Sequence, residues 1–175
     1  MNGTARFSPC GQYRYLLTRP IPAPFWKPDA GEAVFVMLNP STADASEDDP
    51  TIRRCIGFAK EWGCTGLTVA NLYALRSTDP KGLWKHRDPV GPENDATLAE
   101  LAETHGRIIC AWGANAKPGR VAAFECLMDL HGATLYSLAT TKAGAPRHPL
   151  YLRGDSLPAI WSAPGDLSNA STGNK

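Results

Sequence analysis

The chain has 175 residues, of which 43% are hydrophobic and 20% charged, and its formal net charge is +1. This length and balance predict one globular domain, and they argue against a disordered chain and against a polycation that binds nucleic acid over its whole surface. None of the five cysteines belongs to a CxxC pair or has a histidine at zinc spacing, so we expect reduced thiols and no metal.

The N-terminus carries no basic segment followed by an apolar stretch, and no apolar run approaches the roughly 20 residues of a membrane span. We therefore expect a cytoplasmic protein without a membrane partner. The domain should span residues 1–163, because residues 164–175 are rich in Gly, Ser, Asn and Asp, which predicts a flexible tail.

The first elements in chain order are a hairpin and a buried strand. Residues 5–19 alternate around the turn residues 8–11, which predicts a β-hairpin, and the proline-rich residues 20–32 predict an irregular connection. Residues 33–38 form a continuous apolar run, typical of a strand buried on both faces. Asp49-Pro50 then predicts the start of a helix, and Gly63 its end.

Strands and helices alternate from there on. Strands are expected at residues 67–70, 108–112 and 135–138, and helices at 93–105 and 119–131. This alternation predicts an α/β fold of three α/β/α layers, with a central parallel sheet of about four strands plus the N-terminal hairpin. Ligands bind such sheets beyond the carboxyl ends of the strands.

Each loop that follows a predicted strand carries polar or aromatic residues suited to a small-molecule site. They are Asn39, Pro40 and Ser41 after the first strand, Asn71 and Tyr73 after the second, Trp112, Gly113 and Asn115 around the end of the third, and His148 after the fourth. Neither a GxGxxG fingerprint nor a GxxxxGK[ST] loop nor a serine nucleophile elbow is present, and we expect no cofactor.

Three segments resemble motifs of the uracil-DNA glycosylase superfamily. Met37-Leu38-Asn39-Pro40 is similar to the first motif, in the branch with Asn before Pro. The strand ending in Asn71 is similar to the base-reading strand. His148-Pro149, with the following Leu-Tyr-Leu-Arg, is similar to the His-Pro motif and its minor-groove wedge. Residues 39–44, 48–51, 89–92 and 148–152 also resemble a bacterial and phage family known only as a domain of unknown function.

The glycosylase resemblance implies cleavage of the N-glycosidic bond of a damaged or modified base in DNA. His148 would stabilise the leaving base, Asn39 would hold the attacking water, and Asp44 is a candidate carboxylate. Asn71 would form hydrogen bonds with the base edge, and the target base must leave the stack to reach Asn71. Residues near the mouth would meet DNA, with Leu150, Tyr151 and Leu152 as a wedge and Lys117, Lys142, Arg147 and Arg153 at phosphates.

Other interpretations stay open for the same residues. Asn39-Pro40 and Asn71 also suit simple turns, His148 suits a surface loop, and Trp112 suits a core aromatic. The pocket could also belong to a module that binds a nucleobase without cleavage, or to a hydrolase or transferase of small nucleosides or nucleotides. A basic strip beside the pocket would favour a polymer, whereas an acidic rim at residues 44–49 would favour a small ligand.

Overall fold

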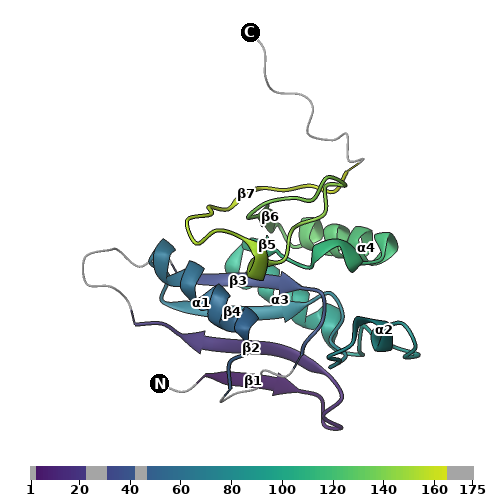
Figure 1. The fold of residues 1–175 in the computed structure, drawn as a ribbon. Coiled ribbons are helices and arrows are strands. Elements are labelled where there is room, and N and C mark those ends of the chain that lie inside the picture. Colours follow the sequence, from purple (N-terminus) through teal and green to yellow (C-terminus); the bar gives the residue numbers. More distant parts are fainter. Residues whose placement is uncertain (1–2, 23–30, 42–46, 165–175) are drawn as a thin grey trace.

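The structure, a computed structural model, describes residues 3–22, 31–41 and 47–164, except for the side chains of residues 80 and 81. Seven strands form one sheet in the order β1-β2-β4-β3-β5-β6-β7 (Figure 1). The strands are β1 (Thr4–Phe7), β2 (Arg14–Pro20), β3 (Glu32–Met37), β4 (Gly66–Asn71), β5 (Arg107–Cys110), β6 (Thr134–Ser137) and β7 (Ala159–Ile160).

The four strands expected from the apolar runs are the parallel centre of this sheet. β3 pairs in parallel with β4 and with β5, and β5 pairs in parallel with β6. The sheet as a whole is mixed, because β2 is antiparallel to β4, β1 to β2 and β7 to β6. The α/β class is confirmed. The expected central parallel sheet of four strands is only part of the observed sheet, because β1, β2 and β7 extend it with antiparallel strands.

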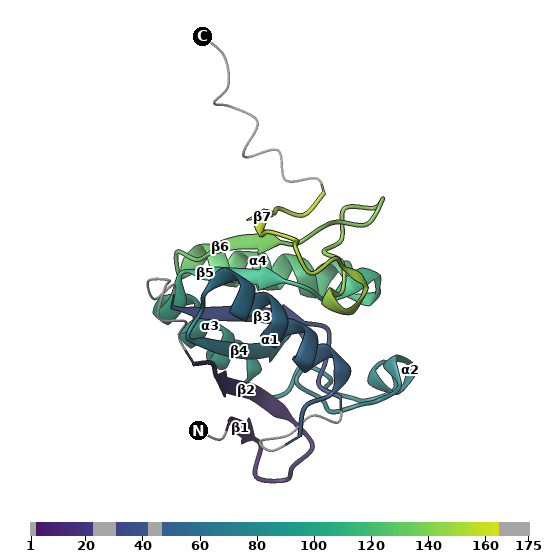
Figure 2. The same cartoon turned by 60° about the vertical axis from the view of Figure 1, so that its left-hand side comes forward.

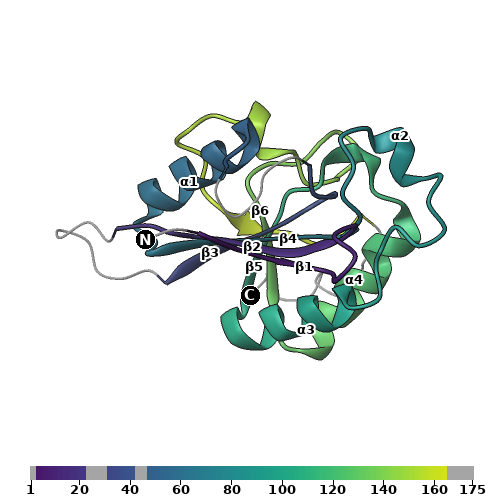
Figure 3. The same ribbon diagram turned by 90° about the horizontal axis from the view of Figure 1, so that it is seen from below.

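The helices are α1 (Pro50–Trp62), α2 (Pro80–Leu83), α3 (Asn94–His105) and α4 (Pro118–Leu130), with 3₁₀ turns η1 (Gly113–Asn115) and η2 (Pro149–Tyr151). Helix α1 covers one face of the sheet over β3 and β4 (Figure 2), whereas α3 and α4 cover the other face (Figure 3). None of the helices in the described ranges is long and apolar enough to cross a membrane.

Each face of the sheet has its own apolar core. Phe58 of α1 packs with Phe35 and Val69 on one face, and Phe124 of α4 packs with Val36 and Ile108 on the other. Because successive strand residues point to opposite faces, β3 supplies both cores, as its unbroken apolar run predicts.

The boundaries of α1 follow from its capping residues. The side chain of Asp49 accepts a hydrogen bond from the N–H of Ile52 at 2.8 Å, and Pro50 occupies the first turn, where its missing N–H costs nothing. Gly63 ends the helix with a φ of 78°, a left-handed conformation that favours glycine. The predicted start and end of this helix are confirmed.

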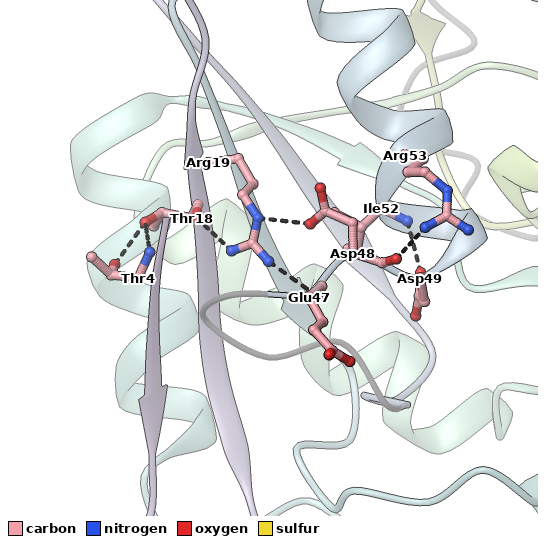
Figure 4. Close-up of polar contacts among 8 residues, drawn as sticks. All are labelled: Thr4, Thr18, Arg19, Glu47, Asp48, Asp49, Ile52 and Arg53. Carbon is pink, nitrogen blue, oxygen red and sulfur yellow. Dashed lines mark hydrogen bonds and ion pairs between the residues drawn. The ribbon is translucent and has the colours of Figure 1, made fainter. Parts of the chain in front are cut away.

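The segment before α1 is tied to β2 by a largely buried ion pair. Arg19 Nε donates to Asp48 at 2.7 Å, and the same guanidinium donates to the carbonyl oxygens of Thr18 and Glu47 (Figure 4). Arg53 of α1 donates to the carbonyl oxygen of Asp48. Besides capping α1, the acidic stretch 47–49 thus holds the helix N-terminus against the sheet.

Candidate functional site

A cavity of about 440 Å³ opens at the carboxyl end of the parallel strands, on the face covered by α1. Its apolar floor is formed by Met37, Val69 and Ile52, which belong to the core under α1. The polar and aromatic groups around this floor come from six separate segments, and they are Arg14, Asn39, Ser41, Asp49, Thr51, Asn71, Trp112, Asn115, Thr141, Arg147, His148 and Tyr151.

Asn71 is the most informative of these groups. It is the last residue of β4, it is only 1% exposed, and it is one of the residues that line the cavity. Its Nδ2 is buried without a hydrogen-bond partner among the described residues. A buried amide donor without a partner costs about 1–3 kcal/mol, so such groups are rare in folded proteins and call for an explanation.

Asn39 is held in one orientation at the end of β3. Its Nδ2 donates to the carbonyl oxygens of Ser77, at 2.8 Å, and Pro40, at 3.0 Å. With both N–H groups satisfied by backbone, the part of this amide that remains for a ligand or water is the acceptor Oδ1.

Among the described residues, the carboxylate that lines the cavity is Asp49, which the sequence patterns indicated as a helix cap and as the end of a possible acidic rim. One oxygen accepts from Ile52 N–H, and the other accepts from the Ser41 hydroxyl at 2.6 Å. A helix that follows a parallel strand begins at the carboxyl edge, so its cap residue necessarily lies near the site. Asp44, the carboxylate proposed from the sequence, lies outside the described residues.

His148 faces the cavity as the cap of η2. Its Nδ1 accepts the N–H of Leu150 at 3.3 Å, which requires an unprotonated Nδ1, so the neutral ring carries its proton on Nε2. Burial lowers the pKa of His148 and the charge of Asp49 partly opposes that shift. The ring is therefore a neutral hydrogen-bond donor at neutral pH.

Arg14 is a buried cation that the sequence interpretation missed. It was expected only as part of the hairpin at residues 5–19, but Arg14 is 3% exposed and lines the cavity. Since β2 is antiparallel to β4, the first residue of β2 lies beside the end of β4, where Arg14 N–H donates to the carbonyl of Ala74 at 2.9 Å. Recognising it required the strand order, which the sequence did not predict.

The loop after β5 forms one wall of the cavity. Trp112 lines it and is also a core residue, packed edge-to-face against Phe124 and Trp161. Gly113 has a φ of 76°, which favours glycine, and its N–H donates to Pro146 O at 2.8 Å. This bond joins the Trp112 loop to the loop that carries His148, so residues predicted from two separate loops lie in one cavity.

Several predicted residues lie elsewhere. Pro40 is buried outside the cavity lining, and Tyr73 is a core residue whose hydroxyl accepts the Lys117 N–H at 3.3 Å. Leu152 is 9% exposed and packs in the core under α1, so it is not available as a wedge, unlike Leu150 and Tyr151, which are exposed.

Most of the cations predicted for a basic strip do not line the cavity. Lys117 lies over the ring of Trp84 at 4.6 Å, and Arg153 forms an ion pair with Asp155 at 2.9 Å. Lys142 is exposed but does not line the cavity. Of these predicted cations, only Arg147 lines the cavity. Within the described ranges, no group of three or more His, Cys, Asp or Glu side chains could hold a metal ion.

The cavity therefore combines an unpaired amide donor, a neutral imidazole donor, an amide acceptor and a carboxylate beside an apolar floor. This is the pattern of a site for a small, mostly apolar ligand with a few fixed polar contacts. No curated protein and no solved structure matches the chain. A family model matches residues 14–150, which include both Arg14 and His148, and the chain belongs to the family described as "Protein of unknown function (DUF1643)".

Proposed function

We propose that the chain binds a nucleobase in this cavity and hydrolyses the N-glycosidic bond that links the base to its sugar. The observation that carries the proposal is the buried Asn71 amide, whose Nδ2 has no partner in the described part of the protein. A base with an adjacent carbonyl and ring N–H presents an acceptor beside a donor, and an amide side chain can pair with both. Binding would then supply the missing hydrogen bond.

The apolar floor suits the faces of a planar ring. Met37, Val69 and Ile52 line the cavity together with the polar groups, and its volume of about 440 Å³ lies within the range of small-molecule sites. A nucleobase is flat, largely apolar on its faces and polar at its edges, so it can use both the apolar and the polar lining residues.

The same groups supply a route for cleavage. When the bond from C1′ to the base breaks, its electron pair goes to the base, and the Nε2–H of His148 stabilises the negative charge there. Water adds to C1′; Asn39 Oδ1 orients it, and Asp49 accepts its proton and opposes the positive charge on the sugar. The proton then passes from Asp49 through water to the base anion, so the products are a free base and a sugar with a hydroxyl at C1′.

The experiment is a base-release assay on a panel of nucleosides and single- and double-stranded oligonucleotides that contain uracil, hypoxanthine, xanthine or 5-substituted pyrimidines. We expect the wild-type protein to release one class of base, and His148→Ala and Asn39→Ala to abolish release. His105→Ala is the matched control, because His105 lies at the end of α3, away from the cavity lining.

Three outcomes would change the proposal. Release that persists in His148→Ala would refute the assigned chemistry. Binding without release, lost in Asn71→Leu, would make the protein a nucleobase-binding module. Neither binding nor release for any panel member would refute the nucleobase assignment itself.

A further inference from the structure

A second hollow in the surface, of about 500 Å³, lies between the hairpin turn and the segment that follows β4. We call it the basic groove, and its lining residues are Gly11, Gln12, Leu75, Arg76, Ser77, Gly82, Lys85 and His86. Three of these eight can carry positive charge and none is acidic. A concave surface with charges of one sign concentrates counter-ions of the opposite sign.

Arg76 is held in place before any ligand arrives. Its Nη1 donates to the carbonyl of Gly11 at 3.2 Å, its guanidinium lies 5.1 Å from the ring centre of Phe7, and its backbone N–H donates to Gln12 O at 3.0 Å. A guanidinium has five N–H donors, and in the described residues its side chain uses one of them. The remaining donors form a preorganised fork of the kind that binds phosphate oxygens.

Lys85 and His86 provide the other donors. The ammonium of Lys85 has neither a hydrogen bond nor an ion pair with any described group, and the residue is exposed. His86 packs edge-on against Tyr13, and the Asp88 backbone engages its Nδ1, which leaves Nε2 for an outside partner. The Asp88 carboxylate accepts the N–H of Gly91 at 2.9 Å.

The basic groove shares a wall with the cavity of Asn71. Asn39 lines that cavity and donates through Nδ2 to the carbonyl of Ser77, which lines the groove. Ser77 N–H donates in turn to Pro40 O at 3.0 Å. A ligand with a flat base and a phosphate could therefore place each part in neighbouring sites.

We propose that the basic groove binds the phosphate groups of a nucleotide or of a nucleic acid strand, through Arg76, Lys85 and His86. That it binds phosphate follows from the groove alone; only the choice of a nucleotide as the carrier rests on the proposed function. The cations that meet phosphate then lie on the β4 side of the cavity, rather than at Lys117 and Arg153.

The test uses a fluorescent single-stranded oligomer of abasic sugar-phosphate units, which offers phosphates but no base, so its binding is independent of the Asn71 cavity. Anisotropy titrations compare wild type with Lys85→Gln, Lys85→Glu and Arg76→Gln at several salt concentrations. Matched controls are Lys60→Gln and Arg107→Gln. Lys60 lies in the last turn of α1 and Arg107 at the start of β5, so both are at the end of the sheet opposite the carboxyl ends of the parallel strands. Thermal melting checks that each variant is folded.

We expect Lys85→Gln and Arg76→Gln each to weaken binding at least about threefold, and to lower the slope of log K against log salt by about 0.7 for each lost contact. Lys85→Glu should weaken binding further. The labelled oligomer is then displaced with competitors at equal phosphate concentration. Displacement by inorganic phosphate or a mononucleotide would identify a terminal phosphate as the ligand. Displacement by unlabelled oligomer but not by these small competitors would identify a strand. Groove variants that bind the oligomer as tightly as the controls do, or wild type that does not bind the oligomer, would overturn the inference.

Because the abasic oligomer lacks a base, its result is distinct from the base-release result. Loss of groove binding with base release intact would refute only this inference. Groove binding without any base recognition would refute only the proposed function.

Discussion

Replacing Asn71 by leucine should stabilise the free protein while it removes ligand binding. Asn71 is 1% exposed and its Nδ2 is buried without a partner among the described residues, so in the free protein this donor has lost water and gained nothing. Leucine has a similar volume and shape, and it would extend the apolar floor formed by Met37 and Val69.

The magnitude follows from the cost of an unsatisfied donor. Removing it recovers about 1–3 kcal/mol, and repacking at an existing cavity takes back a part, so we expect the free energy of unfolding to rise by about 1 kcal/mol. For a chain of 175 residues, that corresponds to an increase in Tm of about 2–4 °C.

The assay is urea denaturation of wild type, Asn71→Leu and Asn71→Asp, with base binding measured on the same samples. Asn71→Asp keeps the shape and places a charge in the core, so it should be destabilised, whereas Asn71→Leu should not. If Asn71→Leu loses 1 kcal/mol or more, the amide is satisfied in the free protein, and the argument that this donor is kept for a ligand fails.

Three further results should follow. Burial lowers the pKa of His148, so the unfolded chain binds its proton at a higher pH than the folded protein does. The free energy of unfolding should therefore fall as the pH drops from 7 towards 5. Urea titrations should show a smaller fall for His148→Gln. Asp49→Asn should keep the helix cap, with a free energy of unfolding within about 0.5 kcal/mol of wild type, whereas Asp49→Ala should lose about 1 kcal/mol. Both variants should abolish base release, and an active Asp49→Asn would contradict the assigned role. Leu152→Ala should lose about 2–4 kcal/mol in the same titrations, and Leu150→Ala less than about 1 kcal/mol, because only Leu152 is in the core; equal losses would contradict that placement.

The parts of the fold that local signals determine could be predicted from the sequence. Asp49-Pro50 and Gly63 mark the two ends of α1 through capping and left-handed backbone, and the structure confirms both. The parallel centre follows from the continuous apolar runs at β3 and β4, because such runs are typical of strands that are buried on both faces.

The parts that depend on long-range pairing could not be predicted. β7 has two residues, too few for a periodic pattern, and it belongs to the sheet only because it pairs with β6. Arg14 reaches the cavity because β2 pairs with β4 in antiparallel orientation, and a hairpin pattern alone does not specify that partner.

The same distinction applies to the candidate site. Asn39, Asn71 and His148 were predicted because a parallel sheet collects the ends of its strands at one edge, and the structure brings all three to one cavity. Leu152 was misplaced, because an apolar residue after a His-Pro pair has the same local pattern whether it points to solvent or into the core under α1.

The central claim is that Asn71 binds a nucleobase, and the most direct measurement follows the side-chain NH₂ resonances of ¹⁵N-labelled protein during titration with free bases. Their assignment comes from the two resonances missing in Asn71→Leu. The account predicts that one base shifts these resonances in a saturable manner and that Asn71→Leu no longer binds that base. Binding that leaves the Asn71 resonances unchanged and is equally tight in Asn71→Leu would contradict it.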